Sequence, residues 1–201
     1  MFINHTVFAD ITVRVIAGSA RGRRLKSSLR HTLRPTSDKV KGALFNILGQ
    51  RVQDARFLDL FAGTGSIGIE ALSRGAKNAT FVEYNASNAN LIRTNVQVCG
   101  FGNFEIITCD VLRAIGSLQN RGRKFDIIFI DPPYRSNLNL KTLEALDETD
   151  ILEEEHVIIA EQSVKDSLPE RIGRLSSYRV ARFGDTLLSF YRKEEGKNQT
   201  F

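Results

Sequence analysis

Short apolar runs alternate with helical patterns along most of the chain. The apolar runs are continuous, without interleaved polar residues, and lie at residues 56–61, 79–83, 104–108, 125–130 and 156–161. Helices are expected at residues 67–74, 86–99, 111–120 and 138–148. Continuously apolar strands separated by helices are typical of a parallel sheet covered on both faces. The pattern therefore predicts an α/β fold.

The C-terminal part follows a different pattern. Residues 178–192 fit a strand, a turn at Gly184-Asp185 and a second strand, which predicts an antiparallel hairpin that closes the sheet edge. Together with the five apolar runs, this hairpin predicts a mostly parallel sheet of seven strands. Residues 194–201 are polar and are expected to form a tail.

The first 50 residues form a segment of their own. Residues 1–12 lack periodicity and are expected to be a frayed extension, and residues 13–27 predict two short strands around a basic turn. A helix is expected next, with Thr36 or Ser37 as its N-cap and Gly49 at its end. Its apolar face consists of Val40, Leu44, Ile47 and Leu48. We therefore divide the chain into the extension, a hairpin-and-helix segment at 13–50, a main domain at 51–193 and the tail.

Gly42 lies inside the helix expected after the hairpin. A glycine in a helix interior costs about 1 kcal/mol. The sequence offers one reason for it, which is the close approach of another group to the backbone at this position.

Composition excludes several classes of protein. A chain of 201 residues, 42% hydrophobic and 25% charged, suits one globular domain. No apolar run approaches the roughly 20 residues that span a bilayer, and the N-terminus lacks the pattern of a signal peptide. A cytoplasmic protein is therefore expected. Cys99 and Cys109 are predicted to be buried or half-buried thiols, and the scattered histidines predict no metal site.

The positive charge is concentrated near the N-terminus. The net charge is +5, and residues 14–41 hold nine Lys and Arg against one acid, whereas residues 42–201 hold 19 basic and 21 acidic groups. Such a block is either a solvated, solubilising surface or the electrostatic footprint of a phosphate backbone. Charge by itself does not separate these two interpretations.

A glycine-rich loop follows the first apolar run. Gly63, Gly65 and Gly68 match G-x-G-x-x-G between a predicted strand and a predicted helix. Glu83 ends the next strand, where a carboxylate can accept both hydroxyls of a ribose. A loop of this kind serves a dinucleotide enzyme or plain strand–helix packing as well.

Three details favour a different cofactor. Asp59, on the strand before the loop, suits an ammonium group better than a pyrophosphate. Asp110 follows the third strand, where its carboxylate can accept a hydrogen bond from the amino group of an adenine. The backbone amide of Val111 can donate a hydrogen bond beside it. An antiparallel terminal hairpin is foreign to a dinucleotide-binding sheet. Taken singly, Asp110 could be a helix cap and Glu83 part of a surface salt bridge.

With these features the chain resembles the class I S-adenosylmethionine-dependent methyltransferases, which have a Rossmann-like fold. The resemblance implies that Asp59, Glu83 and Asp110 bind the cofactor. The remaining cofactor-binding candidates in this region are Phe61, Gly63, Thr64, Gly65 and Val111.

The sequence Asp131-Pro132-Pro133-Tyr134 ends the fourth apolar run. The two prolines fix the backbone and remove amide donors, so the Asp131 carboxylate and the Pro132 carbonyl are held as acceptors. A planar NH2 group offers two matching donors, and Tyr134 can stack on a base. The alternative is an ordinary strand-ending turn. The motif resembles the signature of methyltransferases that act on adenine N6, guanine N2, cytosine N4 or protein glutamine.

Four segments together carry a more specific resemblance. "RVIAGSARGRRL", "LRPTSDKVKGALFNIL", "LDLFAGTGSIGIEALSRGA" and "DPPY" resemble the bacterial 16S ribosomal RNA guanine-N2 methyltransferases, which modify the small subunit. The resemblance implies S-adenosylmethionine as donor, a guanine in RNA already assembled with proteins as acceptor, and a lid-like segment that includes Arg34 and Thr36. It also implies that Arg21, Arg23 and Arg24 meet RNA phosphates, and we add Lys26 to these candidates.

The chain departs from this family in its first helix. Lys39 and Lys41 replace arginines, and Gly42 replaces an acid. Lysine keeps the charge but lacks the bidentate fork of arginine. The activity class is unaffected, whereas the contacts of this helix are left open.

Three other functions are weighed against this one. A DNA adenine-N6 methyltransferase would need a separate target-recognition region, for which no residues are left over. A non-catalytic RNA-binding assembly factor would not need an intact D-P-P-Y motif. A dehydrogenase would need a base at the hydride site, and none is evident. The sequence identifies neither the modified nucleotide nor the oligomeric state, for which a monomer is expected.

Overall fold

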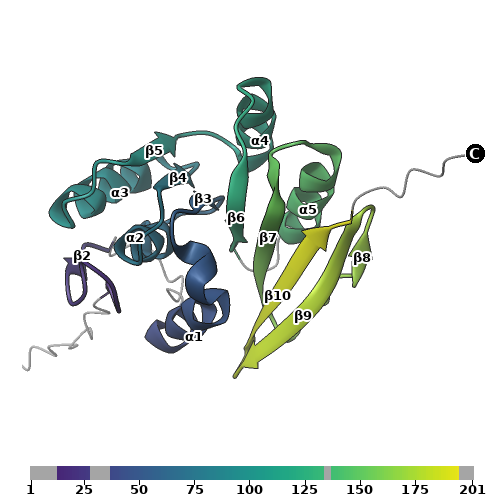
Figure 1. Cartoon of the computed structure of the whole chain (residues 1–201), viewed down its shortest axis with the longest axis horizontal. Coiled ribbons are helices and arrows are strands. Elements are labelled where there is room, and N and C mark those ends of the chain that lie inside the picture. The colour runs from purple at the N-terminus through teal and green to yellow at the C-terminus, as the bar shows by residue number, and fades with distance from the viewer. Residues whose placement is uncertain (1–12, 28–36, 134–136, 195–201) are drawn as a thin grey trace, which may run out of the picture.

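The computed structural model describes residues 13–27, 37–133 and 137–194. Its centre is an eight-stranded sheet in the order β5-β4-β3-β6-β7-β10-β9-β8 (Figure 1). The strands are β3 (Arg56–Asp59), β4 (Asn78–Val82), β5 (Phe104–Ile107), β6 (Phe125–Ile130), β7 (Leu152–Ser163), β8 (Arg171–Ile172), β9 (Leu175–Phe183) and β10 (Thr186–Lys193). The helices are α1 (Asp38–Leu48), the 3-10 helix η1 (Gly49–Val52), α2 (Ser66–Ser73), α3 (Ala86–Val98), α4 (Val111–Asn120) and α5 (Leu138–Glu148).

The predicted strand–helix alternation is confirmed. Strands β3 to β7 are all parallel to their neighbours within this group, and β9 and β10 form the expected antiparallel hairpin around Gly184 and Asp185. Strand β7 begins four residues before the predicted run at 156–161 because its first residues are mostly charged and give no apolar signal.

The sheet has eight strands rather than the seven expected. Strand β10 pairs with β7 on one side and β9 on the other, and the two-residue strand β8 pairs with the beginning of β9. Strand β8 was not predicted.

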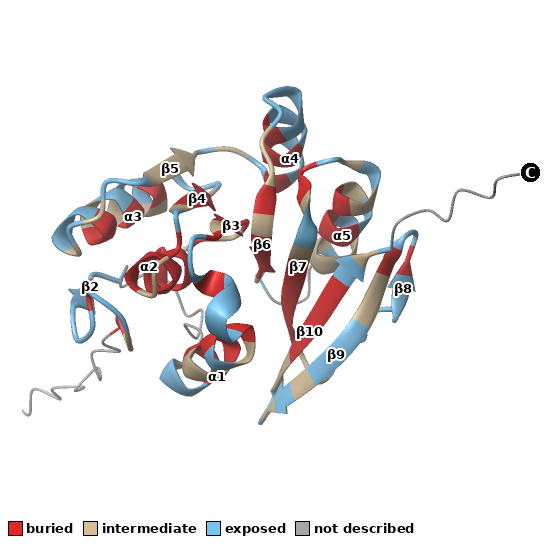
Figure 2. Ribbon diagram, in the orientation of Figure 1, coloured by how far each residue is buried: buried red, intermediate tan, exposed pale blue. Residues whose placement is uncertain are grey.

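Helices cover both faces of the sheet. Leu44 of α1, Ile69 of α2 and Ile92 of α3 belong to one buried cluster, which also contains Phe57. Ile115 of α4 and Leu143 of α5 belong to a second cluster on the other face. Figure 2 shows the buried residues on the central strands and on the helix surfaces that face them. This is the covered parallel sheet that the continuous apolar strands predict.

The N-terminal hairpin is attached firmly to α2. Strands β1 (Val13–Arg14) and β2 (Arg24–Leu25) pair antiparallel. The amides of Ile16 and Ala17 donate to the buried Glu70 carboxylate at 2.7 and 3.0 Å. The Ser73 hydroxyl donates to the carbonyl of Ala17 at 2.6 Å and accepts from the amide of Ala20 at 2.9 Å. Val13 and Val15 belong to the same buried cluster as the sheet, so the hairpin shares its core.

Helix α1 begins and ends as expected, but one of its charged side chains, that of Lys41, is buried. Ser37 is the N-cap and Gly49 follows the last turn, whereas Thr36 lies outside the described residues. Lys41 is 1% exposed, and its Nζ donates to the carbonyl of Arg14 at 2.7 Å and lies 4.0 Å from the Glu70 carboxylate. Burial lowers the pKa of Lys41. One of the nine basic residues of the N-terminal block is therefore unable to meet a phosphate backbone.

No described residue approaches Gly42 closely enough to require a glycine there. A Cβ added at Gly42 would meet no described residue within 4 Å, whereas one at Gly18 would lie 1.8 Å from the Ser73 carbonyl oxygen. We expect Gly42→Ala to raise the free energy of unfolding by about 0.5–1 kcal/mol, because alanine has less backbone entropy to lose. Urea unfolding measures it. Gly18→Ala is the contrasting variant, and it should destabilise the protein because Gly18 has a φ of +82° and no room for a Cβ. A lower free energy of unfolding in Gly42→Ala would contradict the prediction.

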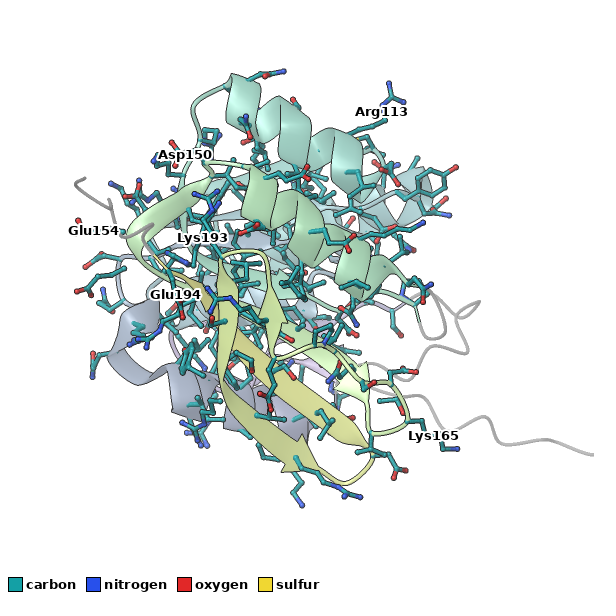
Figure 3. The ribbon with its side chains drawn as sticks, turned by 90° about the vertical axis from the view of Figure 1, so that its right-hand side faces the viewer. Arg113, Asp150, Glu154, Lys165, Lys193 and Glu194 are labelled. Atoms are coloured by element: carbon teal, nitrogen blue, oxygen red, sulfur yellow. The ribbon has the colours of Figure 1, made fainter. Side chains whose placement is uncertain are left out.

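The end of β10 is part of the fold. The Lys193 ammonium donates to the carbonyls of Leu146, Asp147 and Thr149, at the C-terminus of α5, where a cation complements the helix dipole. The Glu194 carboxylate accepts from Arg171 and Ser176, so Glu194 belongs to the fold rather than to the expected tail. Figure 3 shows Lys193 and Glu194 beside the β9–β10 hairpin.

Two further expectations concern composition. Cys99 and Cys109 are half-buried and free, as predicted. Within the three described stretches of the chain, no helix is both long enough and apolar enough to cross a membrane.

Candidate active site

Four carboxylates lie in a row along one edge of the sheet. Asp59 is the last residue of β3, Glu83 follows β4, Asp110 lies three residues beyond β5 and Asp131 follows β6. Because these four strands are parallel and adjacent, their carboxyl ends share one edge, in the order Asp110, Glu83, Asp59, Asp131. Ligands of open α/β sheets bind at this edge. The predicted site residues are thus brought together by the topology.

The glycine loop between β3 and α2 requires its glycines. Gly63 and Gly65 have φ values of +53° and +79°, in the left-handed region that other residues avoid. A Cβ at Gly68 would lie 2.3 Å from the ring of Phe81, so this glycine lets α2 pack closely on β4. The loop therefore turns tightly, and the helix that follows it is held closely against the sheet.

Glu83 holds the glycine loop. Its two carboxylate oxygens accept from the amide of Gly63 and the amide of Asn85, each at 2.8 Å. Both contacts are to backbone amides, so the side chain is fixed by the chain around it rather than by a surface salt bridge. Each oxygen retains a further lone pair for a ligand.

Asp59 is the buried acid of the row, whereas the other three are half-buried or exposed. It is 1% exposed and accepts from the amide of Gly68 at 3.2 Å. Burial raises the pKa of Asp59 to about 7, and the negative charges of Asp131 and Glu83 act in the same direction. The ionised form of Asp59 is therefore poorly stabilised in this site, mainly because the carboxyl group is buried. A cationic ligand would stabilise that ionised form.

Asp110 caps helix α4. One carboxylate oxygen, Oδ1, accepts from the amides of Leu112 at 2.9 Å and Arg113 at 3.4 Å, which is the alternative that the sequence left open. The Asp110 side chain is exposed. Both capping hydrogen bonds go to Oδ1, so the cap does not use Oδ2. Capping and ligand binding are therefore compatible in one residue.

The Asp131-Pro132 elbow extends the end of β6. Strand β6 is bound to β3 through the Leu60 amide, which donates to the Phe129 carbonyl at 3.0 Å. Asp131 is half-buried and Pro132 is buried, and the Asp131 charge lies near enough to Asp59 to raise the pKa of that carboxyl group. Tyr134, Arg34 and Thr36 were also predicted as site residues, and they lie outside the described residues.

Two residues near the site were not predicted. Tyr84 directly follows Glu83 and is 80% exposed, and an aromatic residue immediately after a strand-end acid was an available signal. Asn95 of α3 is 1% exposed, and its side-chain amide donates to the carbonyls of Lys26 and Thr64. One asparagine in a helix gives no sequence signal, since its partners are 69 and 31 residues away.

Four residues that are predicted to contact RNA lie on the N-terminal hairpin. Arg21, Arg23, Arg24 and Lys26 are all exposed. Their segment is held on α2 by Glu70 and Ser73, and β2 lies on the side of α2 and α3 in Figure 1. We call these four exposed residues, Arg21, Arg23, Arg24 and Lys26, the basic turn.

Known proteins match the chain over nearly its whole length. The family model described as "Conserved hypothetical protein 95" matches residues 13–192. The chain is 37% identical over 182 residues to "Putative rRNA methyltransferase YlbH" of Bacillus subtilis, covering 90% of this chain and 99% of that protein. It is 34% identical over 182 residues to "Ribosomal RNA small subunit methyltransferase D" of Escherichia coli K12, covering 90% of each.

Solved structures agree with the sequence matches. The structure "Putative methyltransferase yhhF from Escherichia coli" has a TM-score of 0.80 and 31% identity, covering 92% of this chain and 99% of that one. The glycine loop, the acidic row and the hairpin segment all lie within the matched residues 13–192. The chain therefore belongs to the conserved hypothetical protein 95 family.

Proposed function

We propose that this protein transfers a methyl group from S-adenosylmethionine to the exocyclic N2 amine of a guanine in 16S ribosomal RNA. The observation that carries the proposal is the row of four carboxylates at the strand ends, bounded by the Asp131-Pro132-Pro133 elbow. Methylation of ribosomal RNA accords with the names of its relatives. The choice of guanine N2 rests on the family resemblance of the four sequence segments.

The chemistry of the acidic row suits S-adenosylmethionine. This cofactor carries an ammonium group and a sulfonium, and it lacks the phosphates that a basic loop would bind. The Asp59 carboxylate would accept hydrogen bonds from the ammonium group, and the Glu83 carboxylate would accept them from the ribose hydroxyls. The Asp110 carboxylate would accept a hydrogen bond from the adenine amine, beside the backbone amide of Val111. The backbone of Phe61, Gly63, Thr64 and Gly65 is proposed to contact the same cofactor, and Arg34 and Thr36 are proposed to cover it. When bound, the cofactor supplies an electrophilic methyl group.

The elbow holds the acceptor amine. The nitrogen of an exocyclic amine is a poor nucleophile because its lone pair is delocalised into the ring. The Asp131 carboxylate and the Pro132 carbonyl accept its two hydrogens, which favours a pyramidal nitrogen aimed at the methyl group. The bound cofactor would supply the methyl group to this nitrogen, and Asp131 or solvent would take the proton that the nitrogen then loses. Tyr134 is proposed to stack on the base.

The proposed partner is 16S RNA in the small ribosomal subunit or its assembly intermediate, in the cytoplasm, with the protein acting as a monomer. The test is methylation of small subunits from cells that lack this protein, followed by mass spectrometry of the RNA nucleosides. N2-methylguanosine at one position is the expected product. N6-methyladenine in duplex DNA would support the DNA methyltransferase instead, and RNA binding without any transfer would support an assembly factor.

The basic turn is proposed to contact RNA phosphates. We expect Arg21→Glu/Arg24→Glu to weaken small-subunit RNA binding by about tenfold or more, because two attractive charges become repulsive. The slope of log affinity against log salt should become shallower by about one for each phosphate that is no longer neutralised. Filter binding across a salt series measures both. The control Arg51→Glu/Lys77→Glu makes the same change of charge at exposed positions before β3 and β4. Equal weakening in both variants would contradict a specific role for the turn.

A further inference from the structure

Asn95 joins the basic turn to the glycine loop. Its Nδ2 donates to the carbonyl of Lys26 and to the carbonyl of Thr64, each at 2.9 Å, and its Oδ1 accepts from the amide of Lys26 at 2.8 Å. The residue lies on α3 and is 1% exposed. Both donors of this buried amide and its acceptor oxygen are therefore used across two segments that are far apart in the sequence.

The glycine loop also packs on the same face of α3. A Cβ at Gly65 would lie 3.1 Å from the side chain of Ile92, which is one turn before Asn95. The loop thus has both a polar and an apolar contact with this helix. A shift of Thr64 or Gly65 would have to move α3 or break the bond to Asn95, since an unpaired buried amide is costly.

The basic turn has two separate attachments. Glu70 and Ser73 of α2 hold its first part, through the backbone of Ile16, Ala17 and Ala20. Asn95 holds the segment that leaves β2, through both backbone groups of Lys26. The second attachment is the one that also contacts the glycine loop, through Thr64.

We propose that Asn95 is a positioning residue that couples RNA binding at the basic turn to cofactor binding at the glycine loop. The inference rests on the proposed function. A ligand that fixes the Thr64 backbone fixes the Asn95 amide, which fixes Lys26 in the orientation that presents the basic turn. Such coupling is reciprocal, so RNA also tightens the cofactor site by the same factor.

The coupling is measured by a thermodynamic cycle. We expect the dissociation constant of S-adenosylhomocysteine to fall by about fivefold or more when the wild-type protein is saturated with small-subunit RNA. Asn95→Leu keeps the branched shape of the side chain without the hydrogen bonds, and it should reduce this ratio to about one. The control Asn103→Leu removes an amide that donates to the Lys77 carbonyl before β4, and it should keep the wild-type ratio.

A second measurement needs no RNA. Hydrogen exchange at the Lys26 amide should slow when S-adenosylhomocysteine is added to the wild type, and it should not respond in Asn95→Leu. If Asn95→Leu does not fold, Asn95→Asp serves the same purpose, because it retains the acceptor for Lys26 and lacks the two donors.

The outcomes separate the two proposals. If the wild type binds no S-adenosylhomocysteine, the proposed function fails. If it binds both ligands without coupling, or if folded Asn95→Leu keeps both the ratio and the exchange response, the inference about Asn95 alone is wrong. A purely structural role predicts lower stability in Asn95→Leu with an unchanged ratio.

Discussion

Asp131→Ala is expected to lower the rate of methyl transfer to small subunits by about 10³-fold while the protein still binds S-adenosylmethionine. The carboxylate is one of the two acceptors proposed to orient the amine, and the prolines that follow it carry no amide donor that could compete with the amine. The loss should therefore appear in the single-turnover rate. Cofactor binding uses the other three acids of the row and should persist, as calorimetry would show.

Two further variants sharpen this test. Asp131→Asn keeps the shape and one acceptor oxygen, so its rate should lie between those of the wild type and Asp131→Ala. Asp131→Ala and Asp131→Asn each remove a negative charge that raises the pKa of Asp59, so the pKa of Asp59 should fall in both variants. Asp150→Ala removes an exposed acid that pairs with Lys124 just before β7, at the opposite edge of the sheet, and should leave the rate unchanged. Full activity in Asp131→Ala would show that the elbow is only a strand-ending turn.

Cofactor binding is expected to release a proton from Asp59. The pKa of Asp59 is about 7 because the carboxyl group is buried beside other negative charges. An ammonium ligand needs the ionised form, so affinity should fall by about tenfold per pH unit below pH 7. Calorimetry at pH 6 in buffers of different ionisation enthalpy counts the released proton. Asp59→Asn should bind more weakly and release none, and equal proton release in both proteins would refute the assignment.

The same group should make stability depend on pH without any ligand. The carboxyl pKa is raised on folding, from 3.8 to about 7, so the folded state holds a proton that the unfolded state has lost between these values. The stabilisation from Asp59 is fully present below pH 3.8 and is lost as the pH rises to 7, by about 1.4 kcal/mol per unit. Urea unfolding should show Asp59→Asn gaining stability relative to the wild type across this window. A constant difference would contradict the raised pKa.

The chain carries local signals for most of its elements. Continuous apolar runs predicted β3 to β7, and turn residues at 184 and 185 predicted the β9–β10 hairpin, because these patterns repeat within a few neighbouring residues. Parallel strands bring their carboxyl ends to one edge, so the acids that follow successive apolar runs are expected to lie together on sequence grounds alone. The acidic row and the elbow at Asp131 follow from this rule.

Contacts between distant segments followed no such rule. Lys41 looked like a surface charge, yet it is buried beside Glu70, and Asn95 looked like any polar helix residue, yet it joins Lys26 to Thr64. The place of β10 between β7 and β9 likewise depends on pairing across the sheet. The pKa of Asp59 depends on burial and on charges from other strands. The residue types were visible in the sequence, but their partners lie far along the chain, and only folding brings those partners within the few ångströms over which hydrogen bonds and charges act.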